Sequence, residues 1–129
     1  MIKINELKEG DYVMADFEGQ AKEGVVTELN HEDKEICVRT DVQTFWFKPE
    51  DLYPIPLDES QLLKLGFEKE TYENNYTKFK KGPFRVLLNS KGFEDFEIWY
   101  REDHRLIKMP IAVHQLQNHY LQMTKVELV

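Results

Sequence analysis

The feature that most constrains the fold of this chain is the close spacing of turn signals in residues 1–57. Clusters of Gly, Asp, Asn and charged residues occur at 8–11, 19–24, 30–35 and 40–43. Such clusters interrupt regular structure, because Gly adopts left-handed conformations and Asp or Asn side chains bond to the backbone of their own turn. The segments between them are about four to six residues long, which is typical of strands and too short for stable helices.

The apolar residues between these turns alternate, as expected for strands with one buried face. Val13, Ala15 and Phe17 share one face of the first strand. PEDL at 49–52 suits a single helical turn that begins with proline, and a last short strand is expected after it. This pattern predicts a small SH3-like β-barrel over residues 1–57. The residues expected to share one face in each of its later strands are Val25, Thr27 and Leu29, then Ile36 and Val38, then Phe45 and Phe47.

The part of the chain from residue 58 onward is expected to begin with a short helix and continue as an antiparallel meander. Asp58 or Ser60 can cap the helix, and Gly66 suits its C-terminal end. Three further turn signals, KKGP, NSKG and REDH, then separate four strand-like segments. These segments are residues 75–79, 84–89, 93–100 and 105–113.

A second helix is predicted over residues 113–124, and its apolar stripe should pack on the meander. The fold class is therefore predicted as α+β, with domains at 1–57 and 58–129. The sequence leaves open whether these two parts form one compact unit, and whether residues 125–129 form a strand or an extended tail. The apolar stripe consists of Val113, Leu116, Tyr120 and Met123.

The net charge of −7 is concentrated in the first half of the chain. Residues 1–57 contain six Lys and Arg against thirteen Asp and Glu, whereas residues 58–129 contain eleven of each. An acidic surface repels a phosphate backbone, so the first half is not expected to bind nucleic acid. Nucleic-acid binding by the second half remains an alternative, through an exposed Trp99 and a basic cluster that a solvated hairpin tip would also explain. The cluster consists of Lys78, Lys80, Lys81 and Arg85.

No motif for catalysis, for phosphate binding or for a metal site is present. GxSxG, GxxxxGK[ST] and GxGxxG do not occur, and the single cysteine, Cys37, lies in a strand-like segment. His114 and His119 are five residues apart, which places them about 140° apart around a helix and not on one face. Neighbouring carboxylates such as Asp16 and Glu18 are common in so acidic a chain. We therefore expect no metal, no cofactor and no enzymatic activity, although a small enzyme without a recognisable motif remains an alternative.

The candidate binding residues are aromatic side chains of the first half and polar side chains of the last helix. Trp46 should point outward if Phe45 and Phe47 face the core, and it could also fill a gap between the two halves of the chain. Amides on the last helix can bind a partner, or they can fix the helix to the sheet. The candidates are Tyr12, Trp46, Tyr53, His114, Gln117 and Asn118.

The N-terminal sequence MIKINELKEGDYV has no apolar run typical of a signal peptide, and no segment approaches the roughly 20 apolar residues of a membrane span. A cytoplasmic location is the expectation. Exposed strand edges also make a homodimer an expected assembly.

The closing segment VHQLQNHY resembles that of a group of small proteins from Bacteroidota, their phages and mobile elements. Further similarities to this group are at residues 10–13, 54–57 and 62–67. The chain departs from the group at His119, Gln122 and Lys125, where an apolar residue, a small residue and Gly are expected. The loss of Gly at 125 bears on whether a tight left-handed turn follows the helix. The resemblance implies a mobile-element context and carries over no catalytic residues.

The function expected from the sequence is a non-enzymatic module that binds a protein or peptide.

Overall fold

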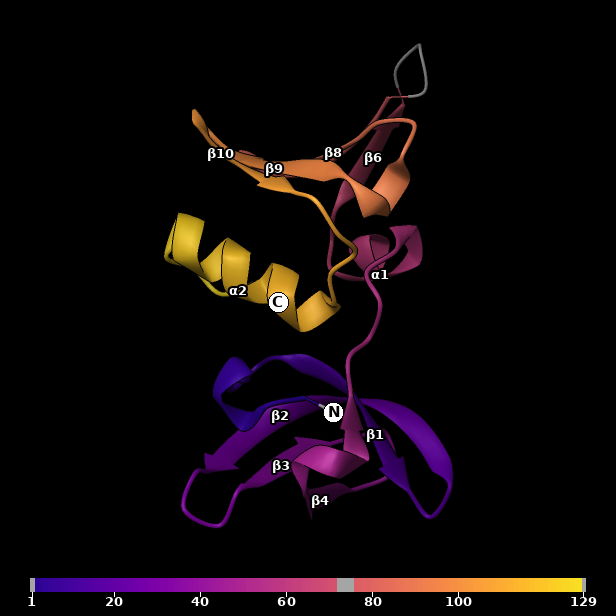
Figure 1. Ribbon diagram of the computed structural model, residues 1–129, viewed down its shortest axis with the longest axis vertical. Coiled ribbons are helices and arrows are strands. Elements are labelled where there is room, and N and C mark those ends of the chain that lie inside the picture. Colours follow the sequence, from indigo (N-terminus) through magenta and orange to yellow (C-terminus); the bar gives the residue numbers. More distant parts are fainter. Residues whose placement is uncertain (1, 72–75, 129) are drawn as a thin grey trace. The chain divides into compact units, whose positions relative to one another are not determined.

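The structure is a computed structural model that describes residues 2–71 and 76–128. The chain divides into a first unit, residues 1–55 with 112–115, and a second unit, residues 56–111 with 116–129. Each unit contains one antiparallel sheet of five strands, and a helix follows near the C-terminus, so the fold class is α+β as predicted (Figure 1). Within the described residues, no helix has both the length and the apolar character that a membrane crossing requires.

The sheet of the first unit has the strand order β4-β3-β2-β1-β5, and all neighbouring strands are antiparallel. A 3-10 turn, η2 (Pro49–Asp51), precedes β5, because proline at its start favours a helical turn. No pairing joins β4 to β5 in the described part of the chain, so the sheet is not closed into a barrel. The other elements are η1 (Ile4–Glu6), β1 (Tyr12–Phe17), β2 (Gln20–Asn30), β3 (Glu35–Arg39), β4 (Thr44–Phe47) and β5 (Leu52–Tyr53).

A β-bulge in β2 changes which of its residues face the core. The register with β3 shifts between Val26 and Glu28, where β2 has one residue more than its partner. An extra residue reverses the alternation of side chains beyond it. Val26 is therefore buried and Leu29 packs against the core, whereas Val25 and Thr27 are only half-buried. The prediction that Val25, Thr27 and Leu29 share one face was therefore wrong, because it assumed an unbroken strand.

The core of the first unit receives side chains from all five strands. Ile36 and Val38 are fully buried, as their alternation predicts. Phe45 shares its face of β4 with the buried Phe47, but 39% of Phe45 is exposed. The reason is that β4 is an edge strand, so no further strand covers its outer side. The buried cluster consists of Ile2, Leu7, Val13, Ala15, Val26, Ile36, Val38, Phe47 and Leu52.

The sheet of the second unit is a meander with the order β10-β9-β8-β7-β6. It has one strand more than the four that the sequence predicts. The additional strand, β6, has the sequence EKET and lacks apolar alternation, because it is an edge strand with mostly exposed side chains. Residue 75 of the predicted first strand lies outside the described residues. The elements are α1 (Glu59–Lys64), β6 (Glu68–Thr71), β7 (Thr77–Lys81), β8 (Phe84–Leu88), η3 (Gly92–Glu94), β9 (Phe96–Tyr100), β10 (Asp103–Ile107) and α2 (Val113–Thr124).

Helix α1 begins and ends as the sequence predicts. The Asp58 carboxylate accepts a hydrogen bond from the backbone N–H of Gln61 at 2.8 Å, which caps the first turn. Gly66 has a φ of +92°, and the next residue, Phe67, donates its N–H to the Leu62 carbonyl at 3.1 Å. This left-handed ending satisfies a carbonyl that would otherwise lack a partner in the last turn.

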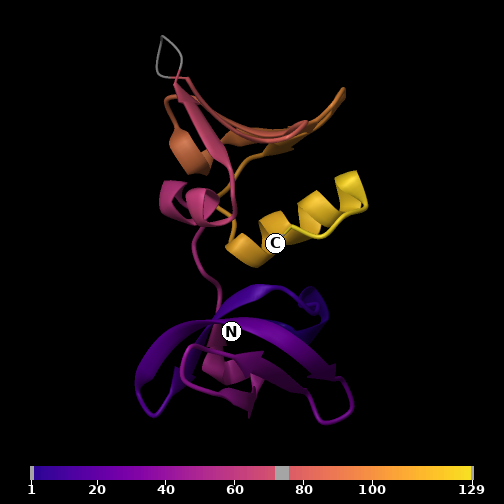
Figure 2. The same cartoon turned by 180° about the vertical axis from the view of Figure 1, so that it is seen from behind.

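Helix α2 lies along one face of the second-unit sheet, as views from both sides show (Figure 2). Leu116 is fully buried, and the Tyr120 ring lies 4.7 Å from that of Phe84, so the predicted apolar stripe does pack on the meander. The chain leaves the helix through Lys125, whose φ is +65° and whose N–H donates to the Leu121 carbonyl at 2.8 Å. A tight left-handed turn is therefore present although the position is not Gly. In the described residues beyond it, no further strand forms.

Candidate functional site

An open groove in the first unit brings the end of β1 together with β4. These strands are not neighbours in the sheet, so it is the curl of the sheet that places their side chains in contact. The ring centroids of Phe17 and Phe45 are 4.9 Å apart. The groove has a volume of about 510 Å³. We name it the acidic aromatic groove, and it is lined by Asp16, Phe17, Glu18, Gly19, Glu35, Phe45, Trp46, Phe47, Lys48 and Asp51.

Three aromatic side chains expose apolar surface in this groove. The exposed fractions are 41% for Phe17, 39% for Phe45 and 44% for Trp46. Phe45 packs edge-on against the buried ring of Phe47, with a centroid distance of 6.4 Å and an interplanar angle of 88°. The exposed surface is thus supported by the core below it. A cluster of exposed rings on a soluble protein commonly marks an interaction site.

The groove carries a net negative charge. Four carboxylates and one ammonium group, that of Lys48, line it. In the described part of the chain none of the four carboxylates forms an ion pair, and Asp16 Oδ1 is buried without a hydrogen-bond partner. A buried carboxylate oxygen without a donor is energetically unfavourable, so a donor or cation supplied by a ligand would be stabilising there. The carboxylates are those of Asp16, Glu18, Glu35 and Asp51.

Strand edges also border the groove. Strand β4 pairs with β3 on one side and has no neighbour on the other among the described residues. Strand β1 pairs with β5 only through Met14 and Ala15, so the edge at Asp16 and Phe17 lies beyond that pairing. Unpaired backbone groups at such edges are available to an extended chain from another molecule.

Of the aromatic residues predicted to bind, only Trp46 lines the groove. Its side chain is 44% exposed. Tyr12 is half-buried and Tyr53 is 43% exposed, yet neither lines the groove. The aromatic side chains beside Trp46 are instead Phe17 and Phe45. Alternation places Phe17 on one face with Val13 and Ala15, and Phe45 on one face with Phe47. It carries no signal that either ring lies at an open edge.

Of the three residues of the last helix that are candidates for binding a partner, two are almost fully buried. His114 and Gln117 are only 2% and 1% exposed, and Asn118 is half-buried. His114 Nε2 lies 3.4 Å from a Glu6 carboxylate oxygen, and Gln117 donates its amide N–H to the Leu128 carbonyl at 3.4 Å. These contacts give the two side chains a structural role, and they leave little of either side chain accessible to a partner.

The basic cluster of the second unit is engaged by intramolecular partners. The ammonium groups of Lys78 and Lys80 lie 3.4 and 2.7 Å from the Glu70 carboxylate. Lys81 faces the opposite side of β7, where its ammonium group donates to the Leu65 carbonyl at 2.9 Å. Arg85 pairs with Lys80 and shares its face of the sheet, so three of the four cations lie on one face, but Glu70 offsets the charge of two of them. This weakens the case for nucleic-acid binding.

The remaining members of that predicted nucleic-acid site are also in contact with one another. Trp99 is only half-exposed and stacks on His104, with a centroid distance of 4.4 Å and an interplanar angle of 16°. The guanidinium carbon of Arg85 lies 5.5 Å from the Trp99 ring centroid, and Arg85 also donates to the Arg101 carbonyl at 2.5 Å. A base that stacked on this Trp would compete with these contacts.

Among the described residues, no three His, Cys, Asp or Glu side chains are arranged to hold a metal ion. Cys37 is 7% exposed. The buried carboxyl of Asp11 has its pKa raised by desolvation, against the opposing effect of Lys8. Lys8 also donates its backbone N–H to Asp11 Oδ2 at 3.1 Å, so this carboxyl stabilises its own turn.

Comparisons of the chain with protein-family models, with curated proteins and with solved structures gave no match. The chemistry of the acidic aromatic groove is therefore the strongest functional signal of this protein. Exposed rings beside carboxylates suit the binding of a cation that carries an aliphatic stem.

Proposed function

We propose that the protein is a non-enzymatic module that binds a basic, extended segment of a partner protein in the acidic aromatic groove. The proposal is carried by one observation: a groove with a single lysine is lined by three exposed rings and by four carboxylates that form no ion pair within the described residues. A Lys or Arg side chain can pack its methylenes on the rings and place its charged head near the carboxylates. The free edge of β4 can bond to the backbone of the same segment.

We propose further that the first unit is related to SH3-like folds, with its sheet left open between β4 and β5. The support is its meander order with the short β5 beside β1, the eleven-residue strand β2 with its bulge, and the 3-10 turn before β5. We also propose that the protein belongs to a mobile element of Bacteroidota, because its closing segment resembles that of the group named above. We propose a homodimer as its assembly, because strand edges are free.

The test is calorimetric titration of the protein with a lysine-containing heptapeptide and with the same peptide carrying Glu in place of Lys. We expect the basic peptide alone to bind, and its affinity to fall as salt is raised, because exposed charges are screened. A double variant of the groove, Glu18→Gln with Asp51→Asn, should weaken binding roughly tenfold by removing two attractive charges.

A matched control separates the groove from the net charge of the protein. Glu9→Gln with Glu32→Gln removes the same number of charges at exposed positions that do not line the groove, and it should change the affinity less than about twofold. Equal losses in the two variants, or no binding of the basic peptide at low salt, would refute the proposal. Tighter binding of a single-stranded oligonucleotide than of the peptide would favour nucleic acid instead.

A further inference from the structure

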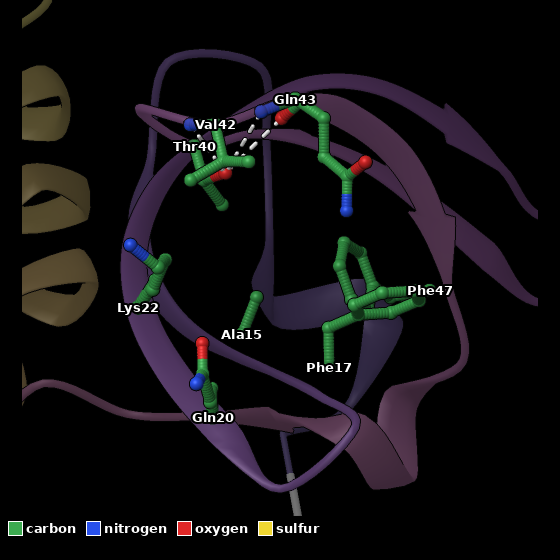
Figure 3. Close-up of a pocket in the computed structure, with 8 residues that line it drawn as sticks. All are labelled: Ala15, Phe17, Gln20, Lys22, Thr40, Val42, Gln43 and Phe47. Carbon is green, nitrogen blue, oxygen red and sulfur yellow. Dashed lines mark hydrogen bonds between the residues drawn. The ribbon is translucent and has the colours of Figure 1, made fainter.

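A second cavity in the first unit adjoins the acidic aromatic groove. It is smaller, with a volume of about 80 Å³, and the two share Phe17 and Phe47 as lining residues. Figure 3 shows Ala15 at the centre of this cavity, with the two rings on one side and polar side chains around the others. The surface that these residues expose to the cavity is nevertheless mainly apolar, whereas the groove exposes polar and apolar surface in similar amounts. The full lining is Ala15, Phe17, Gln20, Lys22, Thr40, Val42, Gln43 and Phe47.

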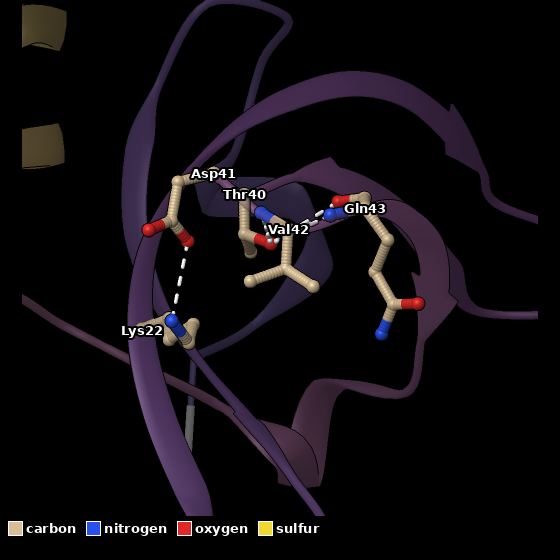
Figure 4. A network of polar contacts seen from close by, with 5 residues as sticks. All are labelled: Lys22, Thr40, Asp41, Val42 and Gln43. Carbon is tan, nitrogen blue, oxygen red and sulfur yellow. Dashed lines mark hydrogen bonds and ion pairs between the residues drawn. The ribbon is translucent and has the colours of Figure 1, made fainter.

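The loop at one side of this cavity is fixed by its own hydrogen bonds (Figure 4). Thr40 Oγ1 accepts hydrogen bonds from the backbone N–H groups of Val42 and Gln43, both at 3.3 Å, and the Thr40 N–H donates to the Gln43 carbonyl at 2.9 Å. The Lys22 ammonium group lies 3.4 Å from the Asp41 carboxylate, which links the loop to β2. The loop holds Val42 beside the cavity although 64% of this residue is exposed. The cavity is therefore preformed.

The volume limits what can enter. About 80 Å³ exceeds the roughly 30 Å³ that one water occupies in the liquid, and it is well below the roughly 150 Å³ of an apolar cavity that accepts benzene. An isopropyl group or a smaller aliphatic group fits between these limits, whereas an aromatic ring does not. Because the walls are apolar, water gains few hydrogen bonds inside, and its replacement by an aliphatic group is favourable.

We infer that the basic segment bound in the groove also inserts a small aliphatic side chain, valine or smaller, into this cavity. The inference rests on the proposed function. The shared Phe17 and Phe47 make the two sites continuous, so one segment can occupy both. In an extended chain, side chains two residues apart point the same way and are separated by about 6.7 Å. Because the two sites share both rings, we place the basic residue and valine close together in the segment, with one residue between them.

The test is calorimetric titration of the full chain with three heptapeptides, Gly-Ser-Lys-Ser-X-Ser-Gly with X as Gly, Val or Trp. The Gly peptide measures the groove alone. Val should bind roughly tenfold more tightly than Gly, because its side chain leaves water, and Trp should gain nothing from the cavity because its ring does not fit. Ala15→Val fills the cavity from its centre, and Val42→Gln makes its exposed rim polar.

Each variant should reduce the preference for Val over Gly to less than about twofold while the affinity for the Gly peptide stays within about twofold of the unaltered protein. The rim variant guards against misfolding of the cavity-filling one, since position 42 is exposed. Equal binding of the Gly and Val peptides, or a preference that survives both substitutions, overturns the inference and leaves the proposed function standing. Failure of every Lys peptide to bind overturns both.

Discussion

The two units use their phenylalanine rings in opposite ways. In the second unit, Phe79, Phe84 and Phe96 are at most 1% exposed, whereas in the first unit Phe17 and Phe45 are each about 40% exposed. The apolar face of the second sheet is covered by α2, which is a separate element. The first sheet curls over its own core, and at the free edge of β4 no element covers the last rings. This difference indicates that the rings of the second unit serve stability, and that those of the first unit are available for binding.

The largest expected effect tests this difference directly. Phe79→Ala should lower the free energy of unfolding of the second unit by about 3–5 kcal/mol, because a fully buried ring is lost and leaves a cavity. Phe45→Ala should cost the first unit about 1 kcal/mol, since the ring is partly exposed already. Urea denaturation can follow each unit separately by fluorescence in variants that keep one tryptophan, Trp46 in the first unit or Trp99 in the second.

Peptide titration tests whether the exposed rings of the first unit, unlike the core of the second unit, contribute to binding. Phe45→Ala should weaken binding of the basic peptide, whereas a milder core substitution in the second unit, Val86→Ala, should leave it unchanged. A loss of stability in Phe45→Ala as large as that in Phe79→Ala would instead make the exposed rings of the first unit structural.

The units also differ in how their buried ionisable groups respond to pH. Burial raises the pKa of Asp11 in the first unit above its usual 3.8, so the native carboxyl keeps a proton that the unfolded chain has already released. In the second unit the pKa of His119 is lowered below 6.5, first by burial and then by the charge of Arg105. Arg105 lies 2.7 Å from His119 Nδ1, and as a donor it requires this nitrogen to be unprotonated.

The two groups are therefore expected to act in opposite directions. The contribution of Asp11 makes the first unit less stable as pH rises from 3.8 through the raised pKa, because the native state binds more protons there. That of His119 makes the second unit less stable as pH falls below 6.5, because the unfolded state binds more protons. Urea midpoints should be measured across pH. Asp11→Asn should abolish the loss of first-unit stability with rising pH, and His119→Gln should abolish the loss of second-unit stability with falling pH. A dependence that survives its substitution would assign it to other groups.

Particular residues show what the sequence could and could not predict. The alternation at Ile36 and Val38 and the cap at Asp58 were predictable, because each depends on neighbours within a few residues. The bulge after Val26 could not be predicted from the sequence, since it depends on how β2 pairs with β3. The groove could not be predicted either, because it brings Phe17 and Phe45 together from strands that are not neighbours in the sheet. Alternation identifies a residue as core-facing, but it does not tell whether another element covers that face.

The smallest expected effect concerns the end of α2. Lys125 has a φ of +65°, a region where a side chain is strained and glycine is not. Lys125→Gly should therefore raise the free energy of unfolding of the second unit by about 0.5–1 kcal/mol, even though the Lys ammonium group donates to the Gln122 carbonyl at 3.0 Å. Lys125→Ala is the matched control, because it removes the same hydrogen bond and keeps the strain. If Gly proves no more stable than Ala in urea denaturation, the left-handed turn is not populated in solution. A stabilised Gly variant with unchanged peptide binding would show that this turn serves the stability of the second unit and not the groove of the first.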